Sequence, residues 1–263
     1  MPNHTHANDL GDEEANMLVT SGHIEQFQKE GHFLLERAFS ESEVEKLRVE
    51  CQRYVEKKDS EMALAGTATE GVTHRGNRYF AKNSCLDSTY LMNFLLGTTL
   101  EQVVRPILGD DVYLFRDLFA VKYPNGMEFG WHQDSGYMRG RPHKPYLTCW
   151  CPLDDVTVEN GTIWLLPFSV VDSRKTISHV RDKSTNDLIG YDGDEDGIPI
   201  EVPAGSLVVF SSMLLHRTGA NRTDRQRRAY FAEYTPEPIV DFDGSPWNLT
   251  IPFIQDGRRV SEP

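Results

Sequence analysis

The chain has 263 residues, 39% of them hydrophobic, and a formal net charge of −13 at pH 7. A chain of this length and composition can form one large domain with a substantial core. Its acidity argues against nucleic acid or an anionic membrane surface as a partner, and it contains no run of 18 apolar residues of the kind that spans a membrane.

Helical signals dominate the first part of the chain. Residues 1–20 are polar without periodicity and predict a disordered tail, and residues 21–263 are expected to form a single domain. A helical flank is expected over about residues 21–110. Its elements are a short helix from Ile24 to Gly31, a strand over 33–35, a helix opened by the capping box Ser40–Glu43, a loop over 59–76 and a helical region over 88–108.

From residue 111 on, short β-rich runs replace the helical pattern. They cover residues 111–122, 146–152, 161–166, 198–202, 206–211 and 228–234, and turn sequences such as Pro124-Asn125-Gly126 separate them. Strands that cluster after helices predict a mainly β barrel or jelly roll with helices packed outside it. The barrel core is expected over about residues 111–235, and residues 236–263 are expected to form a C-terminal extension.

The four cysteines predict a reducing, cytoplasmic setting. Cys149 and Cys151 lie two apart in a strand-like run, so both side chains are expected on the same face of the strand. This is not the spacing of a CxxC redox pair. Together with Cys51 and Cys85 they are expected to remain reduced.

A metal site is predicted by His132 and Asp134, which have the strand period and therefore project to the same side. His216 follows 84 residues later at the end of the apolar run 208–215. Two imidazoles and one carboxylate form the facial triad of Fe(II) oxygenases, which leaves metal positions open for a co-substrate and O2. A lone histidine at such a strand end is more often structural, but the His-x-Asp pair and a downstream arginine reverse this expectation.

A carboxylate-binding group is predicted downstream of His216. Arg227 follows it by 11 residues, and on adjacent strands both side chains can face one cavity. A guanidinium binds a carboxylate through two parallel hydrogen bonds. Thr218 shares the face of His216 and offers a hydroxyl. Arg222, Arg225 and Arg228 are expected to point to solvent.

Several segments in order resemble the phytanoyl-CoA dioxygenase family of Fe(II)/2-oxoglutarate oxygenases, over roughly residues 20 to 235. They are Lys122-Tyr-Pro-Asn-Gly126, Trp131-His-Gln-Asp134, Leu147-Thr-Cys-Trp150, Asn160-Gly-Thr-Ile-Trp-Leu-Leu-Pro167 and the stretch from Leu215 to Ala229.

The resemblance implies a double-stranded β-helix with flanking N-terminal helices. It implies that His132, Asp134 and His216 bind iron, and that Arg227 and Thr218 bind the distal carboxylate of 2-oxoglutarate. Three more residues are implied to line that co-substrate pocket: Trp150, Leu118 and Lys82.

Two features narrow the reaction within the family. The ectoine-hydroxylase branch has a distinctive aromatic and acidic run after the metal carboxylate, and Ser135-Gly-Tyr-Met138 stands here instead. Halogenating relatives lack the metal carboxylate, whereas Asp134 is present. Hydroxylation or desaturation is therefore expected rather than halogenation.

The substrate is expected near the loop 137–144, whose basic residues are suited to a carboxylate, phosphate or phosphonate. Substrate contacts are predicted for Gln133, Tyr137, Arg139 and Arg141, and Trp131 with Tyr137 is considered as a wall of an apolar pocket. A solvated loop and ordinary core aromatics are the alternatives.

The stretch 180–198 lies between barrel strands and is a candidate lid. Within it, Asp192–Gly197 matches the first half of a calcium loop, but Pro203 stands where a bidentate glutamate is expected, which favours an acidic surface loop.

The sequence thus predicts a dioxygenase that hydroxylates an unactivated C–H bond of a small molecule, anionic substrates included, with release of succinate and CO2. Two other readings remain: a non-catalytic ligand-binding or sensor barrel, and another cupin-type metal enzyme. The latter usually gathers three or four histidines around the metal.

Overall fold

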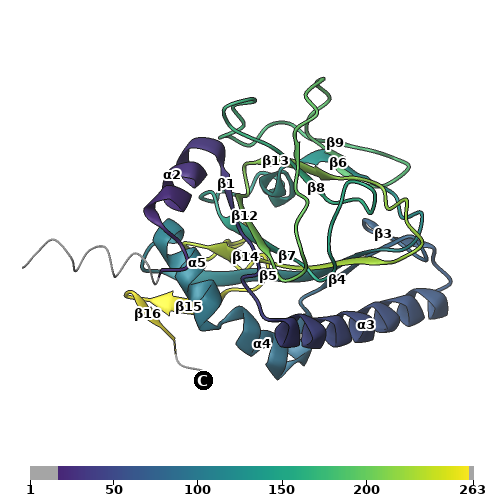
Figure 1. The fold of residues 1–263 in the computed structure, drawn as a ribbon, viewed down its shortest axis with the longest axis horizontal. Coiled ribbons are helices and arrows are strands. Elements are labelled where there is room, and N and C mark those ends of the chain that lie inside the picture. Colours follow the sequence, from purple (N-terminus) through teal and green to yellow (C-terminus); the bar gives the residue numbers. More distant parts are fainter. Residues whose placement is uncertain (1–16, 261–263) are drawn as a thin grey trace, which may run out of the picture.

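The computed structural model describes residues 17–260 (Figure 1). Its helices are α2 (Ser21–Glu30), α3 (Glu41–Leu64), α4 (Thr89–Leu95) and α5 (Thr98–Leu108), with the short 3-10 helices η1 (Ser84–Asp87) and η2 (Asp134–Met138). The principal strands are β1 (His32–Leu35), β4 (Arg78–Lys82), β5 (Val112–Lys122), β6 (Phe129–His132), β7 (Leu147–Pro152), β8 (Ile163–Leu166), β12 (Leu207–Ser211), β13 (Leu215–Thr218), β14 (Arg227–Thr235) and β15 (Ile251–Gln255). The remaining strands have two residues each: β2 (Thr69–Glu70), β3 (Thr73–His74), β9 (Val180–Arg181), β10 (Leu188–Ile189), β11 (Ile198–Pro199) and β16 (Arg258–Arg259).

Two antiparallel sheets form the barrel. The larger one runs in the order β1-β12-β7-β14-β5-β4-β3-β2, with β15 also pairing with β5. The smaller one runs β11-β8-β13-β6. Helices α3 and α4 lie along the large sheet, on the side away from β6, β8 and β13 (Figure 1). This is the predicted jelly roll with flanking helices.

Helix α3 begins where the predicted capping box lies. Ser40 accepts a hydrogen bond from the Glu43 amide, and the Glu43 side chain accepts one from the Ser40 amide, which is the reciprocal capping box. Helix α3 continues to Leu64, so the loop expected from residue 59 begins later. Met62, near the end of this helix, is fully buried.

Strand alternation separates two cores. On β7, Cys149 and Cys151 pack in the core under the helices, whereas Trp150 packs in the core between the sheets. The two cysteines therefore share a face, as their spacing predicts. All four cysteines are buried and free, and burial raises the pKa of the Cys51 thiol to about 12.

Ordered structure is described close to both ends of the predicted domain. Val19 is buried in the helix-side core and Thr20 caps α2, so ordered structure starts before residue 21. The tail prediction for residues 1–16 lies outside the described residues. In the C-terminal extension, Phe253 and Ile254 are buried where β15 extends the large sheet. Within residues 17–260, no helix is long and apolar enough to cross a membrane.

Candidate metal centre and its cavity

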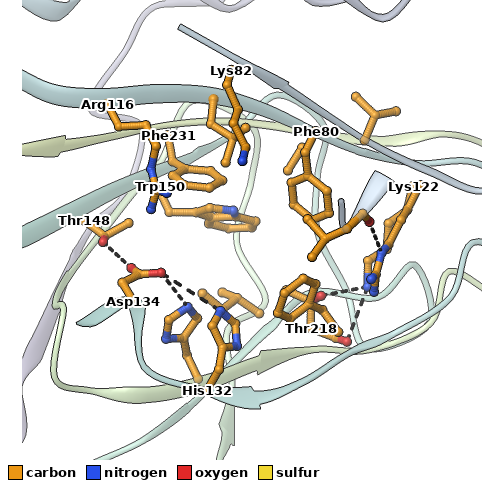
Figure 2. A pocket seen from close by; sticks show the side chains of 18 of the residues that line it. Phe80, Lys82, Arg116, Lys122, His132, Asp134, Thr148, Trp150, Thr218 and Phe231 are labelled. Carbon is orange, nitrogen blue, oxygen red and sulfur yellow. Dashed lines mark hydrogen bonds and ion pairs between the residues drawn. The ribbon is translucent and has the colours of Figure 1, made fainter. Parts of the chain in front are cut away.

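Three predicted ligands converge where the small sheet meets η2. His132 ends β6, His216 lies on β13, and the two are direct partners across these strands. Asp134 begins η2, two residues after His132. Its Oδ1 lies 4.0 Å from Nε2 of His132 and 3.7 Å from Nε2 of His216 (Figure 2). Sequence positions 84 residues apart thus present three ligand atoms to one point.

Hydrogen bonds to the backbone orient both imidazoles. Nδ1 of His132 lies 2.8 Å from the Gly130 carbonyl oxygen, and Nδ1 of His216 lies 3.0 Å from that of Leu214. A carbonyl can only accept, so each Nδ1 carries the proton and each Nε2 presents a lone pair to the centre. Burial lowers the pKa of His132 well below its usual value, which keeps the ring neutral.

The arrangement fits a divalent metal ion. Metal–nitrogen and metal–oxygen bonds of about 2.0–2.2 Å place neighbouring ligand atoms about 3–4 Å apart, as observed for Asp134 and the two imidazoles. The mixed imidazole and carboxylate donor set suits Fe(II). Among the described residues, His132, Asp134 and His216 are the only such group of three or more close ligands. The carboxylates of 192–196 do not form such a group in the described part of the chain.

The cavity beside the triad has a volume of about 110 Å³ and runs along the inner face of the large sheet. The residues of the large sheet that line the cavity can be grouped in rows, each row being a set of residues paired across neighbouring strands. Arg227 and Arg78 both pair with Lys122, and four residues back along β5 Phe231 and Lys82 pair with Leu118. Trp150 extends that second row. Side chains in one row share a face, so all of these residues lie on the cavity side.

A third row of paired residues lies on the other side of the Leu118 row from Lys122. Glu233 pairs with Arg116 on β5 and with Thr148 on β7. Arg116 and Lys122 are six residues apart, which is about 20 Å along a strand. In Figure 2, Arg116 and Thr148 lie on the opposite side of the metal ligands from Lys122 and Thr218. The cavity thus has two distinct charged ends.

Arg227 occupies the first end and has unused donors. Its side chain is buried, and Nη2 donates to the Gly161 carbonyl over 3.1 Å. Nε and Nη1 have no hydrogen-bond partner within residues 17–260. Burial lowers the pKa of Arg227 to about 10, so the guanidinium is still charged at neutral pH. A buried cation with two free donors fits a carboxylate such as that of 2-oxoglutarate.

Lys122 stands beside Arg227 and was not predicted as a site residue. Its Nζ donates to Oγ1 of Thr218 over 2.7 Å and to the Gly219 carbonyl. Burial lowers its pKa well below the usual value, and the charge of Arg227 adds to this effect. The alternation Arg116, Leu118, Lys122 on β5 was the available signal, because period 2 places all three on one face.

Thr148 is the second residue that the predictions did not include. Its hydroxyl donates to Oδ2 of Asp134 over 2.5 Å, which turns Oδ1 toward the imidazoles. The residues that the resemblance implied for the pocket, Trp150, Leu118 and Lys82, all line the same cavity.

Two residues predicted to contact the substrate, Gln133 and Arg141, have polar groups that are engaged elsewhere in the protein. The Gln133 amide nitrogen donates to the carbonyls of Ser173, Lys175 and Met213, and its Oε1 accepts from the Ile177 amide. These contacts satisfy the buried amide fully and hold the following loop. Gln133 therefore anchors backbone and does not face the cavity.

Arg141 is likewise committed to the protein. It donates to the Met138 carbonyl and to Asp241, and its guanidinium lies 3.3 Å from the ring centre of Trp247. Arg139 is exposed, with φ of 52°, and lies outside the cavity. Arg139 and Arg141 therefore do not line the cavity, and a substrate role for the loop 137–144 stays a prediction.

Tyr137 does line the cavity, whereas Trp131 stacks against Arg217 and does not. The Tyr137 hydroxyl accepts from the Leu188 amide over 3.1 Å, which connects it to the β9–β10 hairpin. Arg78 forms a buried ion pair with Asp187 in the same hairpin. The candidate lid is therefore fastened to the cavity wall in this structure.

Comparisons with known proteins agree with this geometry. The family model of phytanoyl-CoA dioxygenase (PhyH) matches residues 27–229. The chain is 30% identical over 145 residues to 2-aminoethylphosphonate dioxygenase of an uncultured bacterium (HF130_AEPn_1), covering 55% of this chain but only 53% of that relative. It is 23% identical over 227 residues to methylphosphonate hydroxylase of Gimesia maris, and the match covers 83% of this chain and 82% of that relative.

The fold is shared with solved structures. EvdO2 from Micromonospora carbonacea var. aurantiaca, crystallised with 2-oxoglutarate, has a TM-score of 0.65 at 23% identity and covers 93% of this chain and 94% of its own. This likeness concerns the fold. The family match covers most of the chain and includes all three metal ligands and Arg227. The chain therefore belongs to the phytanoyl-CoA dioxygenase family of Fe(II)/2-oxoglutarate oxygenases.

Proposed function

We propose that this protein is an Fe(II)- and 2-oxoglutarate-dependent dioxygenase that hydroxylates an unactivated C–H bond of a small molecule. One observation carries the proposal: the triad shares a cavity with a buried arginine, two of whose donors have no partner within residues 17–260. Iron with 2-oxoglutarate and O2 supplies the oxidising power, with release of succinate and CO2. A barrel that only binds a ligand needs no open metal positions, and a cupin-type enzyme usually gathers more histidines.

Each cavity residue has a distinct part in this proposal. His132, Asp134 and His216 hold the metal, and Thr148 keeps Asp134 in the orientation that serves it. Arg227 binds the distal carboxylate of 2-oxoglutarate, and Lys122 with Thr218 completes this end. Trp150 and Leu118 are buried, line the cavity along the carbon chain and exclude water, and Lys82 lines the same cavity.

The substrate is proposed to be a compact polar molecule. The cavity is small, and two relatives are named for aminoethylphosphonate and methylphosphonate. We place the reaction in the cytoplasm, because the four buried cysteines are free and such thiols persist in reducing compartments.

The decisive test is anaerobic addition of Fe(II) and 2-oxoglutarate to metal-free protein, monitored by the weak visible charge-transfer band of the chelate. We expect the band with the unchanged chain and its loss in Asp134→Ala and Arg227→Ala. Arg225→Gln, an exposed arginine two residues away, is the matched control and should retain it. A folded protein without the band would contradict the proposal, and succinate release would then be expected to be absent as well.

A further inference from the structure

The end of the cavity opposite Arg227 holds a charged group that the metal and the co-substrate do not require. Arg116 lines the cavity on β5, and its Nη2 forms an ion pair with Oε1 of Glu233 on β14. Glu233 is completely buried, and the side chain of Arg116 is 15% exposed. Lys82 belongs to the adjacent row of paired residues. This end of the cavity therefore has two cations, Arg116 and Lys82, and one carboxylate, that of Glu233.

Polar atoms around this ion pair are buried and unused. Nε of Arg116, Oε2 of Glu233 and Oη of Tyr146 all lack a hydrogen-bond partner in the part of the chain that the structure describes. Buried polar atoms are nearly always paired in folded proteins. Three unpaired atoms around one ion pair are therefore more typical of a site that completes its hydrogen bonds with a ligand than of a structural salt bridge.

The charges of Arg116 and Lys82 also favour a ligand at this end of the cavity. The pKa of Lys82 is lowered by burial of the ammonium group and then by the nearby charge of Arg116. Lys82 is exposed overall, so water weakens the repulsion between the two cations, and an anion beside them relieves the part that remains. Arg116 is also the residue type that binds carboxylates and phosphonates with defined geometry.

We propose that Arg116, held by Glu233 and assisted by Lys82, binds an anionic group of the substrate, a carboxylate or a phosphonate. This inference rests on the proposed function and names the substrate class: a compact organic anion whose charged group lies at Arg116 and whose carbon atoms lie over the metal ligands. It replaces the loop 137–144 as the place where substrate charge is recognised.

The test measures binding without turnover. Anaerobic protein saturated with Fe(II) and 2-oxoglutarate is titrated calorimetrically with methylphosphonate, with propionate and with neutral propionamide. We expect one or both anions to bind and propionamide to bind at least tenfold more weakly, and the preferred anion distinguishes a phosphonate from a carboxylate substrate. Before each titration the charge-transfer band is recorded, so that co-substrate binding is known independently.

The key variant is the double substitution Arg116→Gln with Glu233→Gln, which removes both charges and leaves no ion without its partner. We expect it to weaken anion binding about 10- to 100-fold, which corresponds to loss of a charged hydrogen bond, while 2-oxoglutarate affinity changes less than twofold. Arg116→Lys should retain part of the affinity. Arg139→Gln, the exposed arginine of the originally predicted loop, is the control and should bind anions as the unchanged chain does.

Equal anion affinity in the double variant and the unchanged chain would overturn the inference. So would a double variant that loses the 2-oxoglutarate chelate, since Arg116 would then serve the co-substrate, or an unchanged chain that forms the chelate and binds neither anion. Absence of the chelate in the unchanged protein is a different result, because it would refute the proposed function itself.

Discussion

The hydroxyl of Thr148 donates a 2.5 Å hydrogen bond to Oδ2 of Asp134, and this bond turns the other carboxylate oxygen toward His132 and His216. Thr148 stands on the large sheet, whereas the three ligands come from the small sheet and η2. The metal centre is therefore oriented by a contact that joins the two layers of the barrel.

Removing this contact should loosen the metal centre. Thr148→Val keeps the shape of the side chain and deletes the hydroxyl, so we expect Fe(II) affinity to fall about 10- to 100-fold, as for other partners of metal ligands. Anaerobic Fe(II) titration of the chelate band measures this. Thr148→Ser retains the hydroxyl and should differ little from the unchanged chain, and equal loss in both variants would argue against the orienting role.

Lys122 is expected to act on 2-oxoglutarate rather than on iron. Lys122→Met removes the cation beside Arg227 and frees the hydroxyl of Thr218, so the co-substrate affinity should fall about tenfold or more. The Kd for 2-oxoglutarate, from the chelate band at saturating Fe(II), is the measurement. Arg222→Gln, on the exposed turn, is the matched control. An unchanged Kd in Lys122→Met would remove Lys122 from the site.

The buried pair of Arg78 and Asp187 should hold the β9–β10 hairpin against the cavity. Asp187→Asn leaves the buried guanidinium without its counter-ion, and breaking such a pair costs about 3–5 kcal/mol. We expect faster hydrogen exchange of amides 180–190 and a lower urea midpoint. Asp196→Asn changes an exposed carboxylate nearby and should alter neither quantity. Unchanged exchange in Asp187→Asn would show that other contacts hold the hairpin.

Glu233 predicts a pH dependence of stability. Burial raises its pKa from 4.5 to about 7, so between these values the folded chain retains a proton that the unfolded chain has lost. The folded state binds more protons in this window, and its stability therefore falls as pH rises, by about 1–3 kcal/mol from this group.

Urea unfolding of metal-free protein at pH 5 and pH 8 tests this dependence. Glutamine cannot titrate, so Glu233→Gln should be less destabilised relative to the unchanged chain at pH 8 than at pH 5. A constant difference between the two proteins across this range would contradict the raised pKa.

Metal and co-substrate should stabilise the fold by mass action. Saturation at about 100 times Kd adds about 2.7 kcal/mol, which for a chain of this size raises Tm by about 5–10 °C. Thermal unfolding with and without Fe(II) and 2-oxoglutarate measures the shift, and a chelator should reverse it. Asp134→Ala should show almost none of this increase, and an equal increase in that variant would point to metal binding elsewhere.

The triad and Arg227 were predictable because their signals are local. The period of a strand places His132 and Asp134 on one side, and His216 is a polar residue at the end of the apolar run 208–215. The helix start at Ser40 was predictable for the same reason, since a capping box is contained within four residues.

Local sequence patterns could not predict which partners the other polar side chains find in the folded protein. From the sequence, Gln133 and Arg141 were expected to be free to contact a substrate. In the folded protein they donate hydrogen bonds to backbone carbonyls and, for Arg141, to a carboxylate. Conversely, Lys122 and Arg116 enter the cavity because β5 pairs with β14 in one register, a relationship between segments more than 100 residues apart. The sequence thus determined the ligand types and the faces of their strands. Only the tertiary structure decided which charged groups remain free in the cavity, because that depends on which buried groups long-range packing leaves without partners.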